Sequence, residues 1–116
     1  METLIYHELR VYNEVTRKHR PIAYYRTPSG VEVDFIVETR RRQSGAPPHI
    51  VAIEAKPASK WDRFWDKPLR NLAAQTGLEV DLCFGVYTGE RAYRLESVQV
   101  LPVAEFLSAL HGRSVF

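Results

Sequence analysis

Hydrophobic side chains recur at helical spacing at the start of the chain, with polar residues between them. A helix that packs on one face repeats its apolar positions every three or four residues. The basic run from Arg17 to Arg20 and the following Pro21 suit the C-terminal end of such a helix. The pattern predicts an amphipathic helix over residues 2–18, with an apolar face made by Leu4, Ile5, Leu9, Val11, Tyr12 and Val15.

Three segments rich in β-branched and aromatic residues follow, and they predict strands over Ile22–Thr27, Val31–Glu38 and His49–Lys56. Proline and glycine at positions 28 and 30 mark a turn, and the polar segment Arg40–Pro48 is expected to be a loop. Because these links are too short for a helical crossover, the three strands are expected to be antiparallel neighbours.

Side chains of a strand alternate between the two faces of its sheet. In Val31–Glu38 the odd-numbered residues are all apolar and share one face, while the even-numbered residues, Asp34 among them, share the other. In His49–Lys56 the residues Ile50, Ala52, Glu54 and Lys56 share one face.

The second half of the chain predicts a helical crossover and a further β region. Lys60–Trp65 suggests a short helical turn, and Asp66 is expected to cap a helix that has Pro68 just inside it and ends at Thr76. Gly77 is the expected stop. Further strands are predicted over Glu79–Tyr87, Arg91–Leu95 and Ser97–Leu101, and a last helix over Val103–Leu110, ended by Gly112.

This order of elements predicts an α/β fold. The helix between strands 49–56 and 79–87 indicates a βαβ crossover. We therefore expect an αβββαβ core, with a mixed sheet flanked by helices, in a single domain over residues 1–116.

Composition and charge narrow the picture only a little. The 116 residues suit one domain, and 45% hydrophobic and 26% charged residues are an ordinary globular balance. A net charge of +2 permits a polyanionic partner without requiring one. The single cysteine, Cys83, excludes an internal disulfide and is expected to be a buried thiol. There is neither a signal-peptide layout nor an apolar run of bilayer length, so a cytoplasmic location is expected.

Asp34, Glu54 and Lys56 are the strongest candidates for chemistry. Two residues apart in one strand, Glu54 and Lys56 must point to the same face. A hairpin folded symmetrically about Ser44 places Asp34 opposite Glu54 and Glu32 opposite Lys56. Adjacent carboxylates either share a proton or bind a divalent cation, for which Mg²⁺ or Mn²⁺ suits oxygen ligands. The alternative is a cross-strand salt bridge between Glu32 and Lys56 on a solvated face.

Two further carboxylates lie in the first helix. Glu8 falls within the apolar face and should point toward the sheet, and Glu2 lies at the edge of that face. Either could lean over the Asp34–Glu54 pair. The alternative for Glu8 is a buried structural acid that pairs with Arg26 or a backbone donor.

The segments ETLIYHEL, YYRTPSGVEVDFIVE and IVAIEAK resemble the PD-(D/E)XK restriction-endonuclease-like superfamily. More closely, they are similar to the uncharacterised C-terminal domain of prokaryotic AAA-type ATPases, over about residues 1–60. The resemblance implies that Asp34 and Glu54 are metal carboxylates, that Lys56 is the catalytic lysine, and that Glu2 and Glu8 match acids of the first helix.

Two features depart from that pattern, namely the long Arg-rich loop and the proline that directly follows Lys56. The sequence also contains no Gly-x-x-x-x-Gly-Lys-Ser/Thr loop, so an ATPase module would be a partner absent from this chain. The chain is then either the detached tail of an ATPase-linked protein or a free-standing domain.

The sequence thus predicts a nuclease-like domain that depends on Mg²⁺ or Mn²⁺ and acts on or binds DNA. The alternative is a catalytically silent module of the same fold that binds or docks. Trp61 and Trp65 are interpreted as core residues or as a cover for the edge of the site, and alternatively as part of a nucleic-acid surface. Candidate phosphate contacts are Arg26, Arg40, Arg41, Arg42 and Lys60.

Overall fold

The computed structural model describes residues 1–26, 28, 30, 32–40, 45–74 and 77–116. Its elements begin in the predicted order αβββαβ. In chain order they are α1 (Glu2–Thr16), β1 (Ile22–Arg26), β2 (Glu32–Arg40), β3 (His49–Lys56), α2 (Arg63–Ala73), β4 (Glu79–Tyr87), β5 (Tyr93–Leu95), β6 (Val98–Pro102) and α3 (Val103–His111).

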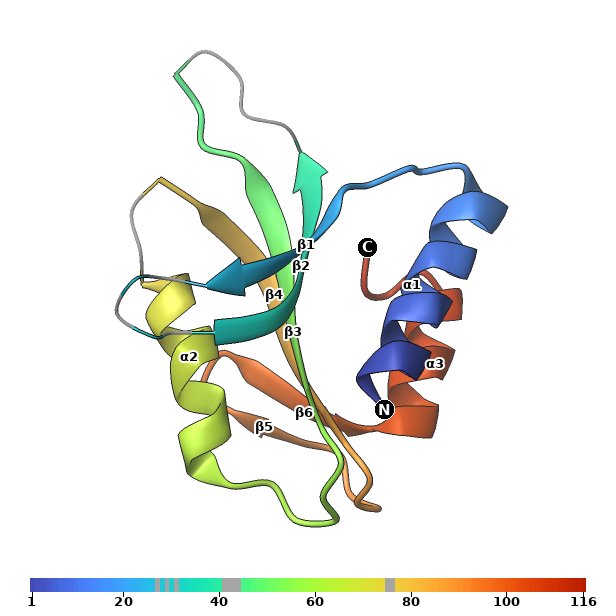
Figure 1. Ribbon diagram of the computed structural model, residues 1–116, viewed down its shortest axis with the longest axis vertical. Coiled ribbons are helices and arrows are strands. Elements are labelled where there is room, and N and C mark those ends of the chain that lie inside the picture. The colour runs from blue at the N-terminus through green and yellow to red at the C-terminus, as the bar shows by residue number, and fades with distance from the viewer. Residues whose placement is uncertain (27, 29, 31, 41–44, 75–76) are drawn as a thin grey trace.

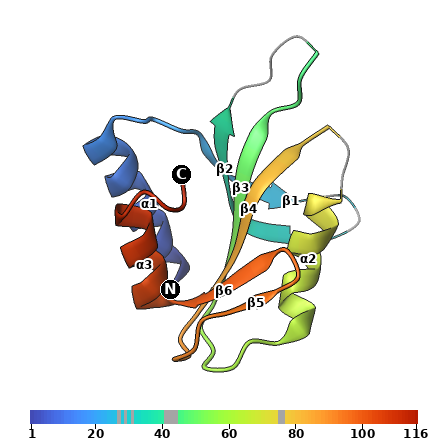
Figure 2. The ribbon, with the colours of Figure 1, turned by 180° about the vertical axis from the view of Figure 1, so that it is seen from behind.

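The described strands form one mixed sheet of six, in the order β1-β2-β3-β4-β6-β5. The first three strands are antiparallel neighbours, while β3, β4 and β6 run parallel. Helix α2 makes the crossover from β3 to β4 and covers one face of the sheet, and α1 and α3 lie together on the other (Figures 1 and 2). The predicted mixed sheet with flanking helices is therefore confirmed.

Each face of the sheet carries its own hydrophobic core. On the α1 and α3 face, Leu9 and Tyr12 pack with Phe84 and Phe106. On the α2 face, the helix side chains Leu69 and Leu72 pack against β3, β4 and β6. Both leucines are fully buried, and such burial contributes about 1.5–3 kcal/mol per side chain. The sheet is thus fixed from both sides, which gives rigid positions to side chains along β3.

Cys83 of β4 belongs to the core on the α2 face, as the sequence predicts. Burial raises the pKa of its thiol to about 11. A thiol that stays protonated at neutral pH is a poor nucleophile.

Helix α2 begins earlier than its sequence pattern indicates. The N-cap is Asp62, whose carboxylate accepts a 2.9 Å hydrogen bond from the Phe64 N–H, so the prediction that Asp66 caps the helix is wrong. Asp66 is instead fully buried. Pro68 lies inside the helix, where it cannot donate a hydrogen bond to the Phe64 carbonyl. The predicted end at Thr76 lies outside the described residues.

Strand β2 contains a bulge that breaks the predicted alternation. Against β1, Ile36 pairs with Ala23 and Val33 pairs with Tyr25, so two residues of β2 oppose one residue of β1. Val33 consequently packs on the α2 face with Ile36, and not with Val37. The residues inside the bulge are Asp34 and Phe35.

Helix α1 is also rotated relative to the predicted face. Its buried side chains are Ile5, Leu9, Tyr12 and Asn13, while Leu4 and Val15 are exposed. The predicted strand ends at Thr27 and Val31 lie outside the described residues. None of the described helices has the length and apolar character needed to cross a membrane.

Candidate active site

Asp34 and Glu54 meet where β2 stops pairing with β3. Phe35 lies opposite Ile53 and Val37 opposite Val51, which is the register predicted from the sequence. Strand β2 begins beside α2 and joins β3 further along (Figures 1 and 2). At the junction the Asp34 Oδ2 accepts a 2.9 Å hydrogen bond from the Ala55 N–H. The Asp34 carboxylate thus accepts a hydrogen bond from the backbone of β3 at the point where the backbone pairing between β2 and β3 ends.

Glu54 lies at the carboxyl end of β3, between β2 and β4, and is only 4% exposed. On β4 its neighbour is Gly85. A Cβ atom at Gly85 would lie 2.6 Å from the Trp61 ring, so only glycine leaves room for that ring. The indole of Trp61 therefore covers the strand beside Glu54.

Burial and Asp34 hold the carboxyl group of Glu54 in its neutral form. Its pKa is raised to about 9, first by burial and then by the hydrogen bond and negative charge of Asp34. The Lys56 ammonium opposes this shift without cancelling it. At neutral pH Glu54 therefore keeps its proton, as expected for a buried carboxyl group held beside a second acid.

Lys56 is the third member of the cluster. Its Nζ lies 3.7 Å from Glu54 Oε1 and 5.8 Å from the centre of the Trp65 ring. The side chain is about one-third exposed, whereas that of Glu54 is nearly dry. Trp65 itself packs edge-to-face on Trp61 at 5.5 Å. The Lys56 ammonium group thus lies between the buried Glu54 carboxyl group and the solvent, next to the Trp65 ring.

Glu32 is not the partner of Lys56 that the alternative salt bridge requires. It pairs with Arg26 of β1, with 3.3 Å between Arg26 Nε and Glu32 Oε1. The bulge and the divergence of β2 from β3 account for this choice, because Glu32 follows β1 and not β3. Arg26, a candidate phosphate contact, is thereby held at an ion pair.

Of the two acids of α1, Glu8 has a partner outside the Asp34–Glu54 pair. Glu8 Oε2 lies 2.9 Å from His111 Nε2 of α3, so the predictions that it points into the site or pairs with Arg26 are corrected. The reason is tertiary, since α3 packs beside α1 and brings His111 to Glu8. Glu2 is exposed in the first turn of α1, and the described contacts of the pair do not include it.

The remaining candidate phosphate contacts are scattered. Arg40 is the last residue of β2, opposite His49, and not part of a loop as predicted. Lys60 is exposed ahead of α2. Arg41 and Arg42 lie outside the described residues.

Two carboxylates can hold a small divalent cation only if further ligands, such as water, complete its coordination shell. No group of three or more His, Cys, Asp or Glu side chains suited to a metal occurs in the described part of the chain. Mg²⁺ commonly takes one or two carboxylates and completes its shell with water. Asp34 and Glu54 fit that limited role once Glu54 has lost its proton.

Sequence reasoning missed the contribution of Gly85. A glycine inside a strand often marks a close approach by another group, and here that group is the Trp61 ring. The interpretation of Trp61 and Trp65 as a cover for the site edge agrees with their contacts to Gly85 and Lys56.

The fold and the site together define a mixed α/β domain with an acid pair and a lysine at the end of a central strand. The chain belongs to the family described as a domain of unknown function, DUF4143, whose model matches residues 1–106. Neither the comparison with curated proteins nor the comparison with solved structures finds a match.

Proposed function

We propose that this protein is a metal-dependent nuclease-like domain of the PD-(D/E)XK type that hydrolyses DNA phosphodiesters. The observation that carries the proposal is the convergence of Asp34, Glu54 and Lys56 at one point of a rigid sheet. The pKa of Glu54 is raised to about 9, and strongly perturbed pKa values cluster at functional sites.

Each residue has a role that follows from its position. Asp34 and Glu54 would hold Mg²⁺ or Mn²⁺, which when bound polarises a phosphodiester and lowers the pKa of water. Lys56 lies beside the acid pair, where it can orient a nucleophile or stabilise charge on the phosphoryl oxygens. Trp61 and Trp65 limit the access of water to Glu54 and so strengthen these interactions.

The test compares the wild type with Asp34→Asn and Lys56→Met on supercoiled, linear and single-stranded DNA with Mg²⁺ or Mn²⁺. We expect cleavage by the wild type, its loss in EDTA, and a reduction of at least 100-fold in both variants. Arg94→Gln, at an exposed residue of β5, is the matched control and should cleave like the wild type. Equal cleavage by the wild type and Asp34→Asn, or none by either, would count against a nuclease.

A second candidate function is a catalytically silent module that binds DNA or docks on an ATPase partner. The observation that favours it is the neutral Glu54, because the hydrogen-bonded acid pair is self-sufficient without a cation. Binding of DNA in EDTA that is unchanged by Asp34→Asn, together with no cleavage, would support this function. Cleavage that requires Asp34 would exclude it.

A further inference from the structure

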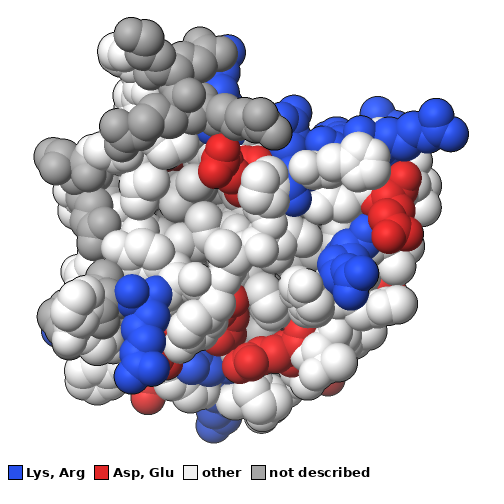
Figure 3. Space-filling view, turned by 45° about the horizontal axis from the view of Figure 1, so that its top comes forward, with Lys and Arg blue, Asp and Glu red and all other residues white. Residues whose placement is uncertain are grey.

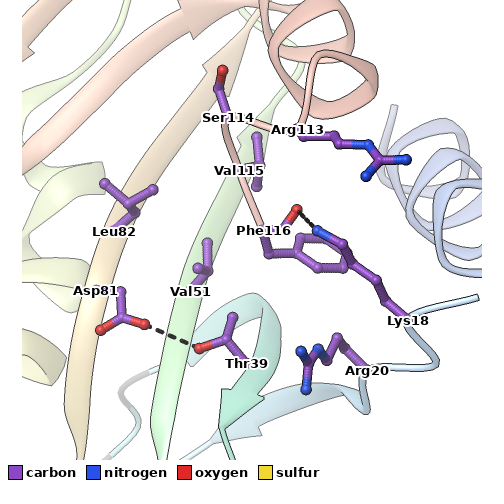
Figure 4. Close-up of a pocket in the computed structure, with 10 residues that line it drawn as sticks. All are labelled: Lys18, Arg20, Thr39, Val51, Asp81, Leu82, Arg113, Ser114, Val115 and Phe116. Atoms are coloured by element: carbon purple, nitrogen blue, oxygen red, sulfur yellow. Dashed lines mark hydrogen bonds between the residues drawn. The ribbon is translucent and has the colours of Figure 1, made fainter. Parts of the chain in front are cut away.

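A basic cavity lies on the α1 and α3 side of the sheet, away from the acid pair. Its volume is about 320 Å³. Lys18 and Arg20 enter from the segment after α1, Arg113 from the turn after α3, and Thr39 and Asp81 from the sheet (Figure 4). In a view turned toward this end of the molecule, Lys and Arg side chains gather along one side (Figure 3).

The segment that carries Arg20 is held by a buried polar side chain. Asn13 is 8% exposed and binds the Arg20 backbone twice. Its Nδ2 donates to the Arg20 carbonyl at 2.8 Å, and its Oδ1 accepts from the Arg20 N–H at 3.0 Å. The position of this arginine is therefore fixed by the core of the domain.

The backbone on both sides of the cavity adopts conformations that non-glycine residues avoid. Arg17 and His19 have φ values of 56° and 51°, and Arg113 has a φ of 63°. In the turn that ends α3, the Arg113 N–H bonds the Leu110 carbonyl at 3.0 Å and the Ser114 N–H bonds that of Ala109 at 2.8 Å. This pattern favours glycine where Arg113 stands. Non-glycine strain of this kind often marks a functional position.

Some charged side chains of the cavity have partners within the protein, and others do not have one among the described residues. Lys18 Nζ donates to the Phe116 carbonyl at 2.6 Å, and Asp81 binds His49 and Thr39 at 2.8 and 3.0 Å. In contrast, neither Arg20 nor Arg113 forms a side-chain ion pair within the described residues. Two guanidinium groups thus remain available to an external anion.

We propose that this cavity binds a phosphorylated ligand between Arg20 on one side and Arg113 on the other. Guanidinium groups match phosphate oxygens in paired hydrogen bonds. The guanidinium groups of Arg20 and Arg113 lie on opposite sides of the Phe116 ring (Figure 4), so each would contact a different phosphate group. The cavity has room for several groups of water size beyond one phosphate. Contact with both arginines therefore requires a ligand with at least two phosphate groups, either a small polyphosphorylated molecule or a nucleic-acid backbone.

The experiment is an amide-resolved NMR titration with pyrophosphate at low salt and in EDTA, so that it does not depend on the nuclease proposal. Shifts are expected in the segments 17–20 and 112–115. The double variant Arg20→Gln and Arg113→Gln should bind at least tenfold more weakly, while Arg94→Gln should bind as the wild type. A parallel titration with a single-stranded oligonucleotide separates the two sources, because binding of the oligonucleotide alone, lost in the double variant, assigns the phosphate to nucleic acid.

Arg113→Gly keeps the proposal testable if the double variant fails to fold. Glycine suits a φ of 63°, so this variant should melt at or above the wild-type temperature while losing affinity for the anion. The proposal is overturned if neither probe binds, or if Arg94→Gln weakens binding as much as the arginine variants do. Unchanged binding by Arg113→Gly would also overturn it.

Discussion

Replacing Glu54 by Gln should flatten the dependence of folding stability on pH. In the native protein the Glu54 carboxyl has a pKa of about 9, against an ordinary value of 4.5. Between these values the native state keeps a proton that the unfolded state has lost. Stability is therefore fully present below pH 4.5 and is lost as pH rises toward 9, at about 1.4 kcal/mol per pH unit.

The magnitude can be worked out over a narrow range. From pH 6 to pH 8 the free energy of unfolding of the wild type should fall by about 3 kcal/mol more than that of Glu54→Gln. The glutamine has the shape of the neutral acid and no proton to lose. The Glu54 side chain is only 5% exposed, so solvent screens little of this effect.

Urea unfolding followed by tryptophan fluorescence measures the difference at pH 6, 7 and 8. Glu105→Gln, at an exposed position in the first turn of α3, is the matched control and should keep the wild-type slope. Parallel pH profiles for the wild type and Glu54→Gln would refute the assignment of a raised pKa to Glu54.

The same proton couples stability to metal binding. A cation held by Asp34 and Glu54 must displace the proton of Glu54, so the affinity for Mn²⁺ should rise about tenfold per pH unit between pH 6 and 8. Calorimetry in buffers of different ionisation enthalpy should show about one proton released per Mn²⁺ bound near pH 7. Binding of Mn²⁺ without pH dependence would contradict a site on these two acids.

Three further substitutions test the packing around the two sites. Gly85→Ala should destabilise the domain by about 1–3 kcal/mol in urea unfolding, because its methyl group would displace the Trp61 ring; an unchanged midpoint would contradict that contact. Asp66→Asn should cost about 1.5–3 kcal/mol, since this fully buried carboxylate lies 2.9 Å from the Arg70 guanidinium, which stays partly exposed beside Glu96, and a loss below 1 kcal/mol would show that the pair is dispensable. Asn13→Ala should cost about 1–3 kcal/mol and speed amide hydrogen exchange at residues 18–20; unchanged exchange would contradict the role of the two Asn13–Arg20 hydrogen bonds in holding this segment.

Long hydrophobic runs and period-two patterns were sufficient to place the central strands. The observed bounds of β3 and β4 match the predicted bounds, and the short links before β3 required antiparallel pairing. The shared face of Glu54 and Lys56 also follows from local geometry, because residues two positions apart in one strand point to the same face. Strand position and side-chain direction of this kind are set by residues that are close together in the sequence.

Other features depended on contacts between distant segments. The bulge at Asp34 arises from pairing with β1, and it sends Glu32 to Arg26. His111 meets Glu8 because two helices at opposite ends of the chain pack together. A choice between Asp62 and Asp66 as helix cap was equally invisible locally, since either carboxylate can cap and only burial against Trp61 and Arg70 takes Asp66 inward.

The sequence by itself determined the order of the elements, the central strands and the three residue types of the candidate site. Only the tertiary structure decided which charges are buried, which acid keeps its proton, and which arginines face a cavity. The physical reason is that strand and helix patterns depend on residues a few positions apart. Desolvation and charge pairing depend instead on groups that the fold brings together from distant parts of the chain.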